Sequence, residues 1–369
     1  MAMVELPEVD RFGPEQVIVV NDPAAHLLGY LVVDNLAAGP AIGGLRMATD
    51  VSVVEVARLA RAMTLKNAAA GLPHGGAKAG IVADPGLPFE EKVRLVRAFG
   101  RAIRDVVGYI PGPDMGLNEP LMAHLRDACG RAVGLPAVLG GIPLDVLGAT
   151  GYGVAIAAEV AAERGAVQLA GARVVVQGFG SVGSHAARFL VQRGAVVVAA
   201  SDSRGAVAND EGLDIEALVA HKATGETVST FAGGSPVAPE DLVGWPCDIW
   251  VPAARPDVLT VENVSDLRAR LVLEGANIPA SREAEERLHA GGVVVVPDFV
   301  ANAGGVICAA VEYAGGTSVQ AFATIEDKIR TNTRLVLDGV AESGEPPRRV
   351  AERIAEQRVE EAMSYRAAP

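Results

Sequence analysis

Cysteine is scarce in this chain, and the three residues that occur exclude two common stabilising devices. Cys129, Cys247 and Cys308 are odd in number and widely separated, and none belongs to the CxxC spacing of a zinc site. Disulfide frameworks are typical of small secreted domains, whose cores are too small to hold the fold alone. We therefore predict neither a disulfide framework nor a metal site.

Positive charge is also in deficit. The chain carries 32 Lys and Arg against 45 Asp and Glu, which gives a formal net charge of −13. A protein that binds a phosphate backbone needs a basic surface. We therefore expect no nucleic-acid partner.

Long apolar runs are missing as well. The apolar runs are short and interrupted, whereas a transmembrane helix needs about 20 predominantly apolar residues. The N-terminal sequence MAMVELPEVDRFG lacks the basic region and apolar core of a signal peptide. We expect a cytoplasmic protein without a membrane-spanning segment.

The composition that remains is that of a two-domain globular protein, with 369 residues, 50% hydrophobic and 21% charged. Strand-like runs at residues 16–20 and 27–33 flank a turn signal and predict a hairpin. The Gly- and Pro-rich stretch 134–153 predicts a domain boundary. Strands alternate with helices after it, which is the pattern of a parallel, doubly wound sheet.

Two lysines stand in surroundings that are otherwise apolar or rich in glycine. A capping-box spacing that begins at Ser52, followed by apolar residues at helical intervals, predicts a helix over 53–70. Lys66 falls at the edge of the apolar stripe of this helix. Arg58 and Arg61 project to the opposite face, where we expect them to be solvated.

The second lysine, Lys78, follows two glycines at the start of a strand, where a ligand can approach the backbone closely. Each lysine alone is equally explained by a hydrocarbon stem that packs on the core. Asp114, in the Pro- and Gly-flanked segment YIPGPDMG, favours a chemical role. One lysine can bind a substrate carboxylate while the other exchanges protons.

A dinucleotide-binding unit is predicted by ARVVVQGFGSVGSHAARFLVQRGAVVVAASDSRG. An apolar strand leads into Gly178, Gly180 and Gly183, and a helix and a second strand ending at Asp202 follow. These features occur in the order that the unit requires: glycines for the turn, a helix N-terminus for the pyrophosphate, and an acid for the adenosine ribose.

The acid at the strand end favours NAD, because a carboxylate repels the 2′-phosphate of NADP. Arg204 could instead meet that phosphate, so NADP stays possible. Later strands place Ala254, Asn277 and Asn302 at carboxyl ends, where nicotinamide and substrate would lie. Each asparagine alone is equally explained by a loop residue that caps its own turn.

The whole set of segments resembles the glutamate/leucine/phenylalanine/valine dehydrogenase family. The segments are AGPAIGGLRM, ARAMTLKNAAAGLPHGGAK, PGPDMG, GATGYG, QGFGSVG, LEGAN and PDFVANAGGV. The resemblance implies an α/β fold in which a substrate domain with a mixed sheet and a Rossmann-type domain enclose a cleft. It also implies homo-oligomers and the reversible, NAD(P)-dependent oxidative deamination of an L-amino acid to a 2-oxo acid and ammonia.

The resemblance further assigns roles to single residues. Lys78 would be the catalytic lysine, Asp114 would handle protons at the amino group, and Lys66 would bind the α-carboxylate. The expected substrate-binding residues are Lys66, Gly43, Gly44, Ile42, Gly112, Thr150, Asn277, Val306 and Ala309. The expected cofactor-binding residues are Gly178, Phe179, Gly180, Ser181, Val182, Gly183, Asp202, Ser203, Ala253, Ala254, Asn277 and Asn302.

The domains follow from the same resemblance. Residues 1–146 would form the substrate-binding and oligomerisation domain, and residues 147–335 the NAD(P)-binding domain. The C-terminal helices within 336–369 would pack back on the first domain.

Departures from the family pattern bear on the substrate. Glutamate members carry a lysine before GGLR and a serine in the GGV segment, which hold the side-chain carboxylate; this chain has Ile42 and Ala309. We therefore expect an apolar L-amino acid such as Leu, Val, Ile or Phe. Because PGPDMGLNEPLM resembles the glutamate members, glutamate is the alternative.

Two other classes of function compete with this prediction. One is a non-catalytic paralogue that senses an amino acid and regulates a partner subunit. The other is a dehydrogenase of similar architecture that acts on a hydroxy acid, an analogy of fold alone. The complete set of Lys66, Lys78 and Asp114 favours the amino acid dehydrogenase.

Overall fold

The computed structural model describes residues 7–366, which form two compact units. The first unit comprises the described residues up to Leu144, together with Val306–Thr324 and the segment from Ile354 onward. The second comprises Asp145–Gly305 and Ile325–Arg353.

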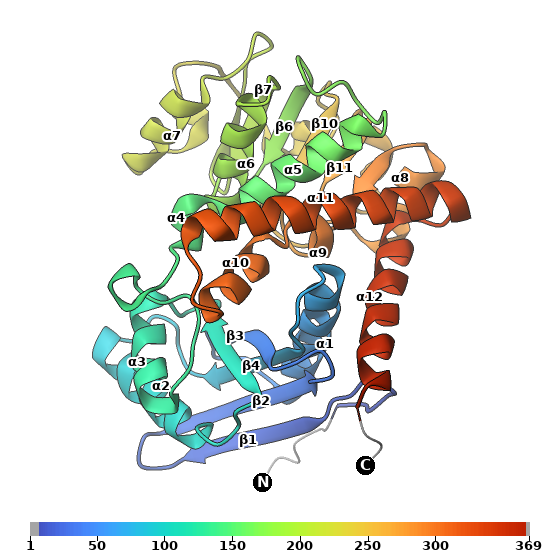
Figure 1. The fold of residues 1–369 in the computed structure, drawn as a ribbon. Coiled ribbons are helices and arrows are strands. Elements are labelled where there is room, and N and C mark those ends of the chain that lie inside the picture. Colours follow the sequence, from blue (N-terminus) through green and yellow to red (C-terminus); the bar gives the residue numbers. More distant parts are fainter. Residues whose placement is uncertain (1–6, 367–369) are drawn as a thin grey trace. The chain divides into compact units, whose positions relative to one another are not determined.

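The first unit is built on a mixed sheet in the order β1-β2-β4-β3-β5. Its strands are β1 Gln16–Asp22, β2 Leu27–Asn35, β3 Ala41–Ala48, β4 Gly76–Val82 and β5 Tyr109–Pro113. β1 pairs antiparallel with β2 at one edge of the sheet, which confirms the predicted hairpin (Figure 1). β3 pairs in parallel with both β4 and β5, so the chain runs in the same direction through all three strands.

Helices cover both faces of this sheet. They are α1 Val53–Ala69, α2 Phe89–Ala102 and α3 Glu119–Cys129, with most of α10 Gly304–Tyr313 and the later part of α12 Pro347–Ser364. Alternate residues of a strand point to opposite faces, so Leu31 and Val33 join the core under α2 and α3 while Val32 packs with α1. The Ser52 side chain accepts the Glu55 amide at 3.2 Å, which confirms the predicted start of α1.

The second unit holds a seven-stranded sheet in the order β12-β11-β10-β6-β7-β8-β9. Its strands are β6 Arg173–Gln177, β7 Val196–Asp202, β8 Gly205–Ala208, β9 Ser235–Val237, β10 Ile249–Pro252, β11 Leu271–Leu273 and β12 Val294–Val296. The five strands from β12 to β7 are parallel, as predicted. The antiparallel edge of β8 and β9 was not predicted; β8 turns back on β7 after only two residues.

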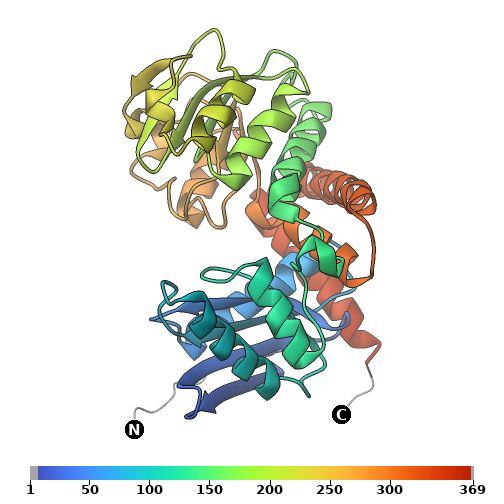
Figure 2. The same cartoon turned by 90° about the vertical axis from the view of Figure 1, so that its left-hand side faces the viewer.

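The helices of the second unit flank this sheet, with α5 packed beside α6 (Figure 2). They are α4 Leu144–Leu147, α5 Ala149–Glu163, α6 Ser181–Val191, α7 Ile215–Ala223, α8 Arg282–Ala290, α9 Asp298–Ala301 and most of α11 Ser318–Ser343. Short 3-10 helices are η1 Ala137–Leu139 in the first unit and η2 Val228–Thr230, η3 Pro239–Leu242 and η4 Val264–Asp266 in the second.

One helical stretch among the described residues, 144–163, is long and apolar enough to cross a membrane, with a mean hydropathy of 1.3. The expectation that no stretch approaches such a length was therefore wrong. Of its most apolar window 61% is buried, and α5 packs against α6, α9 and β11. A helix that is apolar all round and covered by other elements is typical of a protein core.

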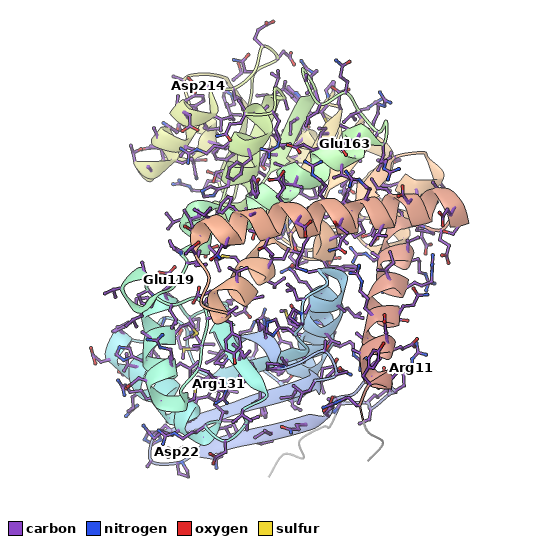
Figure 3. All side chains as sticks on the ribbon, in the orientation of Figure 1. Arg11, Asp22, Glu119, Arg131, Glu163 and Asp214 are labelled. Atoms are coloured by element: carbon purple, nitrogen blue, oxygen red, sulfur yellow. The ribbon has the colours of Figure 1, made fainter. Side chains whose placement is uncertain are left out.

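The chain passes between the units after Leu144, Gly305, Thr324 and Arg353, whereas the predicted domains change only at 146/147 and 335/336. The segment from Val306, which contains most of α10, belongs to the first unit. It is hydrogen-bonded to that unit through Glu312, which accepts the amides of Leu135 and Ile142. Conversely, α11 belongs to the second unit from Ile325 onward. There Arg330 of α11 pairs with Glu163 of α5, which is labelled in Figure 3.

Candidate functional site

Two of the three residues singled out in the sequence are in direct contact. Lys78 lies within β4 and is 8% exposed, and its Nζ is 2.7 Å from Oδ2 of Asp114. Asp114 is the residue after β5. A buried lysine with a carboxylate partner is a place where a proton can be held and passed on.

A third charge, not among the predicted site residues, joins this pair. Arg46 of β3 places its Nε 3.1 Å from the same Asp114 oxygen, and its other end bonds Glu55 of α1 at 2.6 Å. Arg46 stands two residues after Gly44 and therefore on the same face of the strand. That period of two is the sequence signal that could have identified it.

These contacts set the ionisation of Asp114. Burial alone would raise the pKa of the carboxyl, but the charge and hydrogen bond of Lys78, with the charge of Arg46, lower the pKa overall. The carboxyl is therefore ionised at neutral pH and can accept a proton or a hydrogen bond.

The glycines predicted to line the site lie side by side. In the sheet register Gly43 is opposite Pro111, and Gly44 is opposite Gly112. A Cβ added to Gly44 would lie 2.8 Å from the Asp114 Cβ and 3.1 Å from the Lys78 Nζ. The lack of a side chain there leaves room for the Lys78–Asp114 contact.

The strand that ends at Asp114 is fixed by an arginine. Arg131, labelled in Figure 3, donates from Nε to the carbonyl of Tyr109 at 2.6 Å, and from NH2 to the carbonyls of Ile103 and Val106. One guanidinium thus ties the start of β5 to the segment that follows α2. Gly112 and Asp114 follow Tyr109 in the chain. The hydrogen bonds of Arg131 therefore help to fix the positions of both residues.

The remaining predicted substrate residues of the first unit lie on several elements. Lys66 is half-buried in the last turn of α1, the helix that packs on the strand of Lys78. Ile42, in β3, is 3% exposed. Val306 and Ala309 belong to α10, which Glu312 ties to Leu135 and Ile142 through their amides. Thr150 and Asn277 belong instead to the second unit.

The predicted dinucleotide segment has the expected geometry. Gly178 follows β6 with a φ of 100°, and Gly183 packs so closely that an added Cβ would lie 1.9 Å from the Gly178 carbonyl oxygen. Gly180 caps α6 without a side-chain hydrogen bond, and a Cβ there would meet nothing within 4 Å. Ser181 and Val182 begin α6, and Phe179 is buried. An open helix N-terminus of bare backbone fits a pyrophosphate.

Two strand ends meet beside this turn. An added Cβ at Gly178 would lie 2.6 Å from the amide nitrogen of Ala254, just beyond β10. β6 and β10 are neighbours in the sheet although they are far apart in sequence, which makes this its topological switch point. Open parallel sheets bind ligands there, and Ala253 and Ala254 lie at that place.

A second contact joins the segments that follow β11 and β12. The side-chain nitrogen of Asn302 donates to Oδ1 of Asn277 at 3.1 Å. The two predicted asparagines are therefore together. Since both follow strands at the carboxyl edge of the same parallel sheet, they lie along the edge that also carries the glycine turn.

Asp202 differs from the expectation of an acid that is available to a ribose. Its Oδ2 accepts from Nζ of Lys222 at 2.5 Å and from the Val228 amide at 3.0 Å. Its Oδ1 accepts from the Arg204 amide at 2.8 Å and from the Thr227 hydroxyl at 2.9 Å. Burial would raise the pKa of this carboxyl, but the Lys222 bond and the other donors lower it overall.

These contacts occupy both Asp202 oxygens with protein donors and cancel the charge with a lysine. The acid therefore holds the segment after α7 to the end of β7. Ser203, the next predicted cofactor residue, is exposed in the turn between β7 and β8.

Within residues 7–366 no group of three or more His, Cys, Asp or Glu side chains could hold a metal ion.

Comparison with known proteins identifies the family. Residues 140–367 match the glutamate/leucine/phenylalanine/valine dehydrogenase family, and residues 14–131 match the Glu/Leu/Phe/Val dehydrogenase dimerisation domain. The glutamate dehydrogenase of Aeropyrum pernix is 38% identical over 92% of this chain and 86% of its own.

Solved structures of amino acid dehydrogenases are similar to this chain over most of its length. The hetero-hexameric glutamate dehydrogenase of Thermus thermophilus, in a leucine-bound form, has a TM-score of 0.85 and 32% identity over 96% of this chain and 91% of its own. The L-tryptophan dehydrogenase of Nostoc punctiforme has a TM-score of 0.75 and 25% identity over 95% of this chain and 96% of its own. The chain therefore belongs to the glutamate/leucine/phenylalanine/valine dehydrogenase family and is an amino acid dehydrogenase that acts on the CH–NH2 group of its donor.

Proposed function

We propose that this protein catalyses the reversible oxidative deamination of an apolar L-amino acid, with NAD as its main cofactor. The contact between Lys78 and Asp114 is the observation that carries the catalytic part of the proposal. In the reaction the substrate loses a hydride from Cα and a proton from its nitrogen, water replaces the nitrogen, and ammonia leaves. The nicotinamide, when bound, accepts the hydride.

The chain's own residues supply binding and proton transfer. Lys66 binds the α-carboxylate, Lys78 exchanges a proton with the water that attacks the substrate carbon, and Asp114 exchanges one with the amino nitrogen. Because Lys78 and Asp114 are 2.7 Å apart, a proton can pass directly between them. Arg46 helps to orient the Asp114 carboxylate, since its Nε donates to the same oxygen that Lys78 contacts.

The apolar substrate follows from the side chains at two positions. Ile42 and Ala309 stand where the resemblance places a lysine and a serine of the glutamate members, and both belong to the first unit with Lys78. Neither can pair with a carboxylate. An unpaired charge in a desolvated site costs several kcal/mol, whereas a buried hydrocarbon side chain gains about 0.8 kcal/mol for each CH2.

For the cofactor, the glycine turn at 178–183 and the open start of α6 fit the pyrophosphate of a nicotinamide dinucleotide. NAD is proposed as the main cofactor because Asp202 stands at the end of β7, where a carboxylate repels a 2′-phosphate. NADP is proposed to be accepted as well, because Lys222 offsets part of that negative charge. We further propose a cytoplasmic homo-oligomer that forms through the N-terminal domain. Its support is the match of residues 14–131 to a dimerisation domain.

Two observations favour other candidates. The 38% identity with an archaeal glutamate dehydrogenase supports glutamate as the substrate. The similarity to a hetero-hexameric enzyme supports a subunit that regulates a partner chain. The intact Lys78–Asp114 contact favours a working site over the regulatory role.

A substrate screen separates these candidates. The purified chain is tested for NADH and NADPH formation with each of the twenty L-amino acids, and for ammonia-dependent NADH oxidation with the matching 2-oxo acids. The proposal expects the highest kcat/KM among Leu, Val, Ile and Phe, with glutamate lower by roughly a thousandfold. Glutamate as the best substrate would overturn the apolar assignment, and no activity with any amino acid would favour the regulatory subunit.

A further inference from the structure

An arginine enclosed by three carboxyl groups lies in the second unit, outside every predicted site. Arg348 is in the first turn of α12, and its side chain is 12% exposed. The start of α12 lies next to α8 (Figure 1). Its NH2 is 2.9 Å from Oε2 of Glu274 and 2.7 Å from Oε1 of Glu285. Its NH1 is 2.9 Å from Oδ1 of Asp298. These four residues are called the Arg348 cluster below.

The charges of this cluster do not balance if all of its members are ionised. One guanidinium faces three carboxyl groups whose side chains are 0, 4 and 7% exposed. Burial, and then the neighbouring charge of Glu285, raise the pKa of Glu274 well above its usual range. Burying charge is costly, and in some proteins a buried ionic cluster is retained because it specifies one conformation.

The Arg348 cluster holds both ends of one loop. Glu274 directly follows β11, and its Oε2 accepts the amide of Asp298 at 2.9 Å. Asp298 in turn accepts the amide of Ile278 at 2.8 Å. Ile278 has a φ of 49°, in the left-handed region that a β-branched residue seldom adopts. These bonds thus hold a loop that includes a residue in a sparsely populated backbone conformation, which persists only where the surrounding structure supports it.

The middle of the same loop carries Asn277. Asn302 is the C-cap residue of α9, and its side chain donates to Asn277 Oδ1 at 3.1 Å and to the carbonyls of Gly275 and Ala276 at 3.3 Å. Asp298 begins the same short helix. Arg348 is thus connected to Asn277 by two routes. One runs through Asp298 and α9 to Asn302, and the other runs through Glu274 and the loop that follows it.

We propose that Arg348 is a positioning residue, which acts through Glu274 and Asp298 to fix the loop that presents Asn277 to cofactor and substrate. This inference rests on the proposed function, with Asn277 in the cofactor- and substrate-binding role that the family resemblance implies. An arginine is required at this place, since its planar fork bonds three acids at once and a lysine is a single point charge.

A double-mutant cycle tests the proposal. Arg348→Lys, Asn277→Ala and the double variant are compared with the wild type for the dissociation constant of NADH, followed by fluorescence, and for kcat/KM. Arg348→Lys is expected to weaken NADH binding and to lower kcat/KM by up to about 100-fold, because a displacement of about 1 Å has that effect. The same substitution is expected to change little in the Asn277→Ala background, since residues that act as a unit are not additive.

The matched control is Arg282→Met. Arg282 joins α8 to α12 through Glu352 at 2.6 Å, but its side chain is 62% exposed. It is expected to behave as the wild type in both backgrounds. If Arg348→Lys does not fold, Asp298→Asn, which keeps the size of the side chain, takes its place in the cycle.

Equal effects of Arg348→Lys with and without Asn277, or no effect on NADH binding, would overturn the inference. The outcome is distinguishable from failure of the proposed function. A wild type that binds NADH but oxidises no amino acid would refute the function, while the NADH measurements would still show whether Arg348 acts through Asn277.

Discussion

The Nζ of Lys78 lies 2.7 Å from Oδ2 of Asp114, within a sheet that buries the lysine almost completely. If this contact carries the chemistry, Lys78→Ala should lower kcat by about 10² to 10⁴, the usual contribution of a general acid or base. Binding of NADH, measured by fluorescence, should be unchanged because the glycine turn belongs to the other unit. A variant that keeps most of its kcat would show that Lys78 is not the acid or base.

A second lysine provides the control for this substitution. Lys328 is half-buried in α11, outside the proposed site. Lys328→Ala should retain the wild-type kcat.

Lys66→Ala should chiefly raise the KM of the amino acid, since Lys66 is proposed to bind the α-carboxylate and not to transfer protons.

Gly44 lies beside the Lys78–Asp114 pair. We expect catalysis to need a residue without a side chain at this position. Gly44→Ala would place a Cβ 2.8 Å from the Asp114 Cβ and 3.1 Å from the Lys78 Nζ, so the pair must shift. A shift of about 1 Å should lower kcat by up to about 100-fold. Gly244→Ala, whose Cβ would meet backbone oxygens only at 3.8 and 3.9 Å, is the matched control. Equal kcat values for the two variants would contradict the expected role of Gly44.

Lys222 is expected to influence the choice of cofactor through Asp202. Lys222→Met would leave the Asp202 charge without its cation, and the Asp202 side chain is only 8% exposed. The ratio of the NADPH to the NADH dissociation constant should therefore rise by more than the roughly two- to fivefold that an exposed ion pair would give. Thr227→Val removes a hydrogen bond from the same carboxylate without a change of charge. It should leave the ratio unchanged, and a Lys222→Met ratio equal to that of the wild type would show that Asp202 does not face the 2′-position.

The nucleotide-binding segment could be predicted from sequence because its information is local. β6, Gly178, Gly183, α6 and β7 follow one another within a single stretch, and each has its own signal in strand pattern or glycine spacing. The hairpin of β1 and β2 was predictable for the same reason.

The partners of buried charges could not be predicted, because they come from distant parts of the chain. Arg46 bonds Asp114 across 68 positions, and Arg348 bonds Glu274 across 74. Helical or strand periodicity indicates which face a side chain occupies, but it carries no information about which residue stands opposite. Asp202 shows the same limit, since its position at the strand end was correct while Lys222 and Thr227, which occupy it, arrive from a later segment.

Arg61 shows how much stability such a missed partner can carry. The expectation that Arg61 is solvated like Arg58 was wrong, because its Nε donates to Asp34 at 2.8 Å and the Asp34 side chain is only 2% exposed. Arg61→Met would leave that buried carboxylate without its cation, which should lower the free energy of unfolding by about 3–5 kcal/mol. Arg58→Met, on the exposed face of the same helix, should change it by less than about 0.5 kcal/mol. Urea unfolding followed by circular dichroism measures both values.

The acid side of the stability profile gives an independent check on Arg61. Its hydrogen bonds to Asp10 hold the pKa of that carboxyl at about 2, against an ordinary value of 3.8. A carboxyl with a lowered pKa stabilises the fold above its unfolded pKa, and this stabilisation is lost as the pH falls through the folded pKa. The wild type should therefore lose stability between pH 3.8 and about 2 by more than Arg61→Met does, because the variant lacks the interaction from the start. Parallel curves of unfolding free energy against pH for the two proteins would mean that the Arg61–Asp10 pair does not form in solution.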